Sequence, residues 1–100
     1  MSLKIDTVQI DKAAQNLKGV ALRTPLQKNL ALSDKYGAEI YLKREDLQIV
    51  RSYKIRGAYN KICSLDKSVL DKGIICASAG NHAQGFAYSC NLLGIKGKVY

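Results

Sequence analysis

A single lysine stands out among the residues that could carry chemistry. Lys54 lies where a polar loop gives way to a helical pattern, with Arg51 and Arg56 close by and Tyr53 directly before it. Neighbouring cations and the positive end of a helix both favour the neutral form of an amine, which is the nucleophile in imine formation. Lys54 is therefore a candidate covalent catalyst, and a solvated surface lysine is the ordinary alternative.

A second candidate is a short segment between an apolar run and a helical stripe. It reads Ser78-Ala79-Gly80-Asn81-His82. A turn of this kind leaves backbone N–H groups of the first helical turn unpaired, and with the helix dipole these groups form an anion site. Ser78 adds a hydroxyl, and Gly80 lets a ligand approach the backbone closely. Asn81 is also a typical helix cap, so a purely structural role remains open.

Cysteine and histidine spacing argues against a metal centre. Cys63, Cys76 and Cys90 form no C-x-x-C pair, and His82 is the only histidine. Zinc sites normally use such local ligand pairs, so no metal is expected. An odd number of cysteines and no secretory signal indicate reduced thiols in the cytoplasm, and apolar neighbours predict that all three are small buried side chains.

Composition and charge narrow the class of protein. The chain has 100 residues, of which 47% are hydrophobic and 24% charged, which is typical of one globular domain. No apolar run reaches the roughly 18 residues of a membrane helix, so no membrane partner is expected. The net charge is +8, and residues 51–100 hold eight basic and two acidic residues. A small nucleic-acid-binding module is therefore the alternative class, although no motif of such modules is present and no nucleic acid is expected.

Hydrophobic periodicity predicts the elements that position Lys54 and Ser78. Helices are expected over 7–18, over 30–36, for about three turns from residue 52, and over 83–93; strands or extended pieces are expected over 26–29, 39–43, 74–77 and 98–100. This alternation indicates right-handed βαβ units on a parallel sheet, with the strand at 74–77 buried on both faces. Ligands bind such sheets in the loops after the strands, which here are Leu47–Lys54 and Ser78–His82. Too few strands are present to form a covered sheet, so we expect an N-terminal fragment of a larger α/β enzyme.

Two motifs in register resemble those of the serine/threonine dehydratases, a family of pyridoxal-phosphate enzymes. Glu45 followed by VRSYKIRG at 50–57 resembles the family's cofactor-attachment signature, and SAGNHAQG at 78–85 resembles its asparagine loop. The segments at 24–26 and 41–46 also match in the expected order. The resemblance spans roughly residues 20–100 and implies the fold-type II (tryptophan synthase β-like) architecture, a parallel sheet with flanking helices. Residues 1–100 would be the N-terminal part of the catalytic domain, with no boundary inside.

The resemblance also implies roles for individual residues. Lys54 would hold pyridoxal 5′-phosphate covalently and act as the base at the substrate Cα. Tyr53 would pack on the cofactor ring, and Asn81 would hydrogen-bond the cofactor's phenolic oxygen. Substrate binding is assigned to Ser78, Ala79, Gly80, Asn81 and His82, with Ser78 and the turn amides holding the carboxylate and His82 expected to pack rather than react.

The implied reaction is the dehydration and deamination of L-threonine to 2-oxobutanoate and ammonia, the first step of isoleucine biosynthesis. L-Serine remains an alternative substrate, and serine racemase, threonine synthase and cysteine synthase of the same fold remain alternative activities. Serine racemases of this fold carry a hydroxyl directly after the position of Ser78. Ala79 cannot transfer a proton, which favours elimination over racemisation.

Part of a complete enzyme of this family is not found in these residues. The eight glycines form no glycine-rich run for the cofactor phosphate, and no partner for the pyridine nitrogen can be named. We therefore expect the isolated chain to be inactive. The resemblance further implies that the complete protein is a cytoplasmic homo-oligomer.

Overall fold

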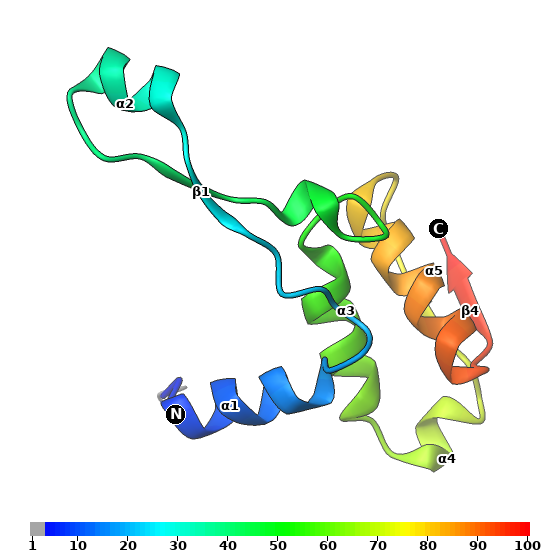
Figure 1. The fold of residues 1–100 in the computed structure, drawn as a ribbon. Coiled ribbons are helices and arrows are strands. Elements are labelled where there is room, and N and C mark those ends of the chain that lie inside the picture. The colour runs from blue at the N-terminus through cyan, green and yellow to red at the C-terminus, as the bar shows by residue number, and fades with distance from the viewer. Residues whose placement is uncertain (1–3) are drawn as a thin grey trace.

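The computed structural model describes residues 4–100 and shows a helical body with a projecting arm (Figure 1). In chain order the elements are α1 (Thr7–Asn16), β1 (Leu26–Lys28), α2 (Leu30–Tyr36), β2 (Tyr41–Lys43), a 3-10 turn η1 (Glu45–Leu47), α3 (Lys54–Cys63), α4 (Lys67–Leu70), β3 (Ile74–Cys76), α5 (Asn81–Leu93) and β4 (Gly97–Val99). Each predicted helix and strand is present, whereas η1 and α4 were not predicted. Within residues 4–100, no helix combines the length and apolar character needed to span a bilayer.

The strands form two separate sheets. β3 and β4 pair in parallel, with Ile74 opposite Gly97, and α5 connects them, which confirms one predicted βαβ unit. β1 and β2 pair antiparallel, with Leu26 opposite Lys43. The prediction that the strand at 39–43 joins the parallel sheet is therefore wrong. β1, the strand that precedes α2, forms the backbone hydrogen bonds with β2, so β2 is part of a hairpin.

The described residues cover only one face of the parallel sheet. Ile74 and Cys76 pack against a core cluster formed by α3 and α5, whereas Ile75, which points to the opposite face, is 71% exposed. Successive side chains of a strand point to opposite faces. The predicted burial of this strand on both faces is thus wrong for the described chain.

Two helices supply most of the core. Ile55, Ala58 and Ile62 of α3 are buried, and Phe86 and Cys90 of α5 are buried against them. These residues recur at three- and four-residue steps, so the predicted stripe of α3 is confirmed. Figure 1 shows α3 and α5 lying alongside each other, with β4 beyond α5.

The apolar spacing over 83–93 predicts a buried stripe, and the observed buried face of α5 shares two residues with it, Phe86 and Cys90; the predicted stripe is Ala83, Phe86, Ala87, Cys90 and Leu93. Gly85 and Ser89 are buried there, whereas Ala87 is exposed and Leu93 is 36% exposed. An apolar count overlooks glycine and serine, although their small size allows two helices to approach closely. At Gly85, α5 lies directly against the backbone at the start of α3.

The three cysteines are free thiols in different environments. Cys90 is buried and Cys76 half-buried, but Cys63 is exposed, so its predicted burial is wrong. Ile62 occupies the core position at this end of α3, and the next residue points about 100° away around the helix. Burial, and to a smaller extent the charge of Cys76, raises the pKa of the Cys90 thiol.

The arm consists of β1, α2 and β2 and extends away from the body (Figure 1). The molecule is 52 Å long with a radius of gyration of 16.4 Å, compared with about 13 Å for a compact chain of this length. Asn29 caps α2 by accepting the Leu32 N–H at 2.8 Å, and Gly37 ends it in the left-handed region. The arm is thus ordered by local contacts, while apolar side chains such as Leu30 remain exposed.

Candidate active site

Lys54 is the first residue of α3, as predicted. Its backbone N–H donates to the Ser52 hydroxyl at 3.4 Å, and Tyr53 is the residue that precedes the helix. The Lys54 Nζ lies 5.2 Å from the centroid of the Tyr53 ring. The amine therefore lies over an exposed aromatic ring at the positive end of a helix.

The loop before Lys54 is held in an unusual backbone conformation. Arg51 has φ of 60°, a left-handed conformation that costs a residue with a side chain about 1–2 kcal/mol. Its N–H donates to the Gln48 carbonyl at 2.8 Å. The Gln48 side chain is fully buried and pairs twice with the Leu22 backbone, accepting its N–H at 2.9 Å and donating to its carbonyl at 2.8 Å. These two hydrogen bonds anchor the loop that precedes Lys54.

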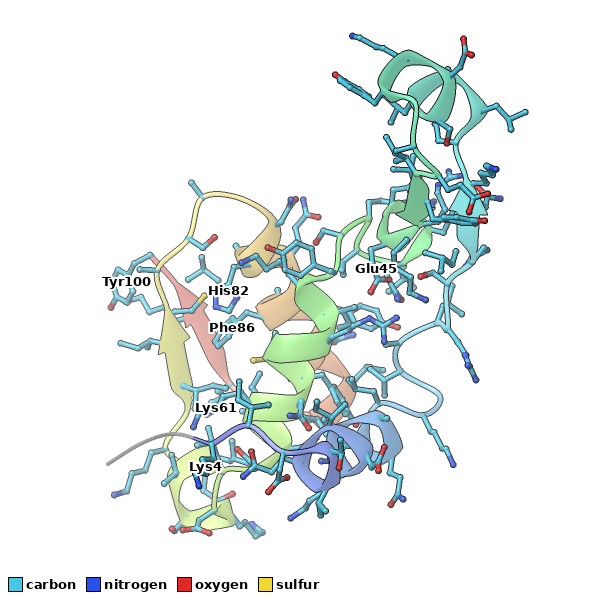
Figure 2. The ribbon with its side chains drawn as sticks, turned by 90° about the vertical axis from the view of Figure 1, so that its left-hand side faces the viewer. Lys4, Glu45, Lys61, His82, Phe86 and Tyr100 are labelled. Carbon is cyan, nitrogen blue, oxygen red and sulfur yellow. The ribbon has the colours of Figure 1, made fainter. Side chains whose placement is uncertain are left out.

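A carboxylate cluster joins the arm, the loop and α3. Glu45 accepts hydrogen bonds from Arg56, from Gln48 at 2.7 Å and from Thr24 at 3.2 Å, and it lies where the arm meets the body (Figure 2). Partial burial opposes ionisation of Glu45, but the bonds from Arg56, Gln48 and Thr24 together with the Arg56 charge outweigh it. They hold the pKa of this carboxyl below its usual value.

This carboxylate cluster (Thr24, Glu45, Gln48 and Arg56) was not predicted from the sequence. Glu45 entered only as part of a resembling motif, and no periodic signal links it to Arg56 or Thr24. Because Arg56 follows Lys54 by two residues, the cluster fixes the first turn of α3 against the segment that precedes β1.

The second predicted segment forms the turn between β3 and α5. The Ser78 hydroxyl accepts the N–H groups of Gly80 and Ala83, both at 3.2 Å. Gly80 is the residue before the helix and Asn81 is its first residue. The prediction that Asn81 caps α5 is therefore wrong: Ser78 supplies the capping oxygen, and the Asn81 side chain is exposed.

Several hydrogen-bond donors remain at this turn. Among residues 4–100, the backbone N–H groups of Ala79, Asn81 and His82 meet no acceptor. Because the Ser78 oxygen accepts two bonds, its own proton is left to donate outward. The turn at the N-terminus of α5 thus offers a hydroxyl and unpaired amides, the donors that a carboxylate requires.

An open cleft of about 690 Å³ takes one predicted residue from each segment, Tyr53 and Asn81, whereas Lys54 and Ser78 are not among its lining residues. It lies between the β1–β2 hairpin and the starts of α3 and α5, and Ser52, Tyr53 and Asn81 line it. Its volume falls in the range of small-molecule sites. Tyr53 and Asn81, predicted from separate motifs, therefore face one common space.

His82 is placed differently. It lines a second hollow of about 430 Å³ together with Phe86 and Ile74, and Figure 2 shows it beside Phe86. His82 begins the helical face that packs towards the sheet, whereas Asn81 faces the cleft. Its predicted part in substrate binding stays a prediction.

No metal centre is evident in the described part of the chain. Among residues 4–100, no three His, Cys, Asp or Glu side chains are grouped so that they could hold an ion.

The sequence matches a known family over most of its length. Residues 17–100 match the family described as pyridoxal-phosphate dependent enzyme. The chain is 57% identical over 97 residues to the biosynthetic L-threonine dehydratase of Halalkalibacterium halodurans, covering 97% of this chain and 23% of the relative. It is 56% identical over 96 residues to that of Bacillus subtilis, covering 96% and 23%. The chain thus spans about a quarter of the length of these curated relatives.

Solved structures show the same fold. The processed form of threonine deaminase isoform 2 from Solanum lycopersicum superposes with a TM-score of 0.77 at 39% identity, covering 99% of this chain and 29% of that one. Maize serine racemase superposes with a TM-score of 0.86 at 32% identity, covering 94% and 30%. The α/β arrangement around α3 and α5 is thus that of fold-type II enzymes.

Proposed function

The chain belongs to the pyridoxal-phosphate dependent enzyme family, and we propose that it is the N-terminal part of the catalytic domain of a threonine dehydratase. The observation that carries this proposal is the common cleft. It is lined by Tyr53 and Asn81, and Lys54 lies at the helix start beside it, over the Tyr53 ring. The choice of substrate is supported by the 57% identity over 97 residues to the biosynthetic threonine dehydratase of Halalkalibacterium halodurans.

The donor set fits pyridoxal phosphate. Lys54 provides a primary amine for an aldehyde, Tyr53 an aromatic face for a planar ring, and Asn81 an exposed amide for a phenolic oxygen. When bound, the cofactor would supply an electron sink for the charge left on the substrate Cα. These residues match the reactive end of the cofactor, and its phosphate would be held elsewhere in the complete protein.

Lys54 would have two tasks. Its Nζ would hold the cofactor, and after release it would remove the proton from the substrate Cα as a general base. The stiff loop before it suits this work, because the positive φ of Arg51 and the buried Gln48 leave the start of α3 little freedom. Such preorganisation keeps the amine in one place when it is set free.

Ser78 would bind the substrate carboxylate. Its hydroxyl proton and the free amides of Ala79 and Asn81 lie at the N-terminus of α5, where the helix dipole favours negative charge. Holding the carboxylate there would orient the Cα–H bond for the base.

Changing Ser78 to alanine tests this binding role. We expect KM for threonine to rise by about 10- to 100-fold, because a hydrogen bond to a charged group is worth about 1.5–3 kcal/mol. Steady-state kinetics of the complete protein would measure it, with Ser68→Ala on the exposed surface of α4 as the matched control. An unchanged KM in Ser78→Ala would contradict the assignment.

Elimination is preferred to racemisation because of Ala79. The fold does not favour elimination, since the serine racemases superpose with TM-scores of 0.86 and 0.85, above the 0.77 and 0.80 of the threonine deaminases. Ala79 carries no group that could return a proton to Cα, so the proton would come only from the Lys54 side. L-Serine as substrate and the racemase activity are the alternatives.

Product analysis of the complete protein tests the proposed reaction. With pyridoxal phosphate and L-threonine we expect 2-oxobutanoate and ammonia in equal amounts, faster than pyruvate forms from L-serine at equal concentration. D-Serine should stay below detection by chiral chromatography. Racemisation without oxoacid formation would overturn the proposal, and faster turnover of serine would reassign the substrate.

The proposal also includes the oligomeric state, the compartment and the partners of the complete protein. We expect the complete protein to be a cytoplasmic homo-oligomer, with L-threonine as its small-molecule partner and neither nucleic acid nor membrane. The free thiols of Cys63, Cys76 and Cys90 support a reducing compartment.

A further inference from the structure

We propose that Gly85 is a positioning residue that sets the spacing between Lys54 and Asn81. This inference rests on the function proposed above. Gly85 touches neither cleft nor ligand; it would act through the packing of α5 against the first turn of α3.

Gly85 lies directly against the backbone of Lys54. A Cβ built on Gly85 would lie 3.0 Å from the carbonyl carbon of Lys54, 3.1 Å from its oxygen and 3.2 Å from the Ile55 nitrogen. Gly85 is buried, and Ile55 is fully buried. Carbon atoms in contact ordinarily lie about 3.5–4.0 Å apart, so a methyl group here does not fit without movement.

The clashing atoms belong to the backbone, which decides what must move. A side chain in the way could change its rotamer, but Lys54 and Ile55 present main-chain atoms at the start of a helix. Close-packed interiors relieve such overlap by shifting whole elements. The methyl would therefore push the first turn of α5 and the first turn of α3 apart.

Asn81 would be displaced with that turn. It lies four residues before Gly85, and residues at this spacing share one side of a helix. Ser89, four residues after Gly85, is also buried, and its hydroxyl donates to the Gly85 carbonyl at 2.7 Å. Asn81, Gly85 and Ser89 therefore follow one another along one side of α5, and Gly85 is the middle residue of the three.

The test is Gly85→Ala in the complete protein, with cofactor binding as the readout. We expect the apoprotein to fold, because alanine is the better helix former, and pyridoxal phosphate to bind about tenfold or more weakly with a displaced visible absorption band. Titration by absorbance and fluorescence would measure both, with thermal unfolding of the apoprotein beside them. The control is Ala87→Ser, which adds one heavy atom on the exposed side of α5 and should leave affinity and band unchanged.

A double-mutant cycle separates positioning from general loosening. If Gly85 acts through Asn81, Gly85→Ala should weaken cofactor binding less than about twofold in an Asn81→Ala background. Additive losses would overturn the inference. Cofactor binding in Gly85→Ala equal to that of the unaltered protein would overturn it as well, as would an equal loss in Ala87→Ser.

A second variant keeps the inference testable if Gly85→Ala fails to fold. Asn81→Gln lengthens the amide side chain by one methylene while Gly85 is intact, and we expect it to weaken cofactor binding and displace the band. Unchanged binding in Asn81→Gln would show that the spacing is unimportant and would overturn the inference. Failure of the proposed function is distinct, because then the unaltered complete protein itself would bind no cofactor.

Discussion

Replacing Lys54 with alanine in the complete protein is expected to lower the rate of threonine dehydration by about 10⁴-fold. In the proposed function, the variant loses both the amine that would hold the cofactor and the base that would act at Cα. The matched control is Lys61→Ala, an exposed lysine in the last turn of the same helix, which should retain full activity. An oxoacid assay measures both variants.

Chemical trapping adds a readout that does not depend on turnover. Borohydride reduction of the cofactor-loaded protein followed by peptide mapping should place the pyridoxyl group on Lys54 and on no other lysine. Lys61→Ala should give the same labelled peptide. Full activity in Lys54→Ala, or a label on a different lysine, would remove the assignment on which the mechanism depends.

Breaking the carboxylate cluster should cause the second large effect. Glu45→Ala leaves the fully buried Gln48 amide and the Arg56 guanidinium without their shared acceptor. Unsatisfied buried donors cost about 1–3 kcal/mol, so we expect the free energy of unfolding to fall by about 2 kcal/mol at pH 7. Glu39→Ala, which removes the exposed Lys28–Glu39 ion pair, is the control and should cost less than about 1 kcal/mol.

The stabilisation that the ionised Glu45 carboxylate provides should depend on pH in a defined direction. The folded protein lowers the pKa of Glu45 below its ordinary value of about 4.3. The stabilisation is therefore fully present above that ordinary value and is lost as the pH falls through the lower, folded-state pKa. The stability difference between the unaltered protein and Glu45→Gln should be constant from pH 7 to about pH 5 and shrink below about pH 4. Denaturant unfolding at several pH values measures it, and a difference that grows in acid would contradict the assignment.

Local signals in the sequence were sufficient for the two turns and for four of the five α-helices of residues 4–100, whereas the four-residue α4 was not predicted. The three- and four-residue spacing of Ile55, Ala58 and Ile62 predicts α3. The helices expected over 30–36 and 83–93 end at those residues, each followed by a glycine, Gly37 or Gly94, in the left-handed conformation. Such features depend on a residue and neighbours within one or two turns, so they can be identified without knowing the rest of the fold.

Pairing between distant segments was not predictable in the same way. The strand at 39–43 was assigned to the parallel sheet, but it pairs with β1. Glu45 meets Arg56 and Thr24 across gaps that no periodicity links. The capping oxygen of α5 comes from Ser78 rather than Asn81, because the turn folds back on itself before the helix begins.

The sequence by itself determined that Lys54 begins a helix and that Ser78 and Asn81 lie at the start of another. Only the tertiary structure decided that Tyr53 and Asn81 face one cleft, that His82 lines a different hollow, and that Gly85 lies against the Lys54 backbone. The reason is physical. Helix starts are specified by local hydrogen bonds, whereas the distance and rotation between two helices depend on which small or large side chains meet where they pack.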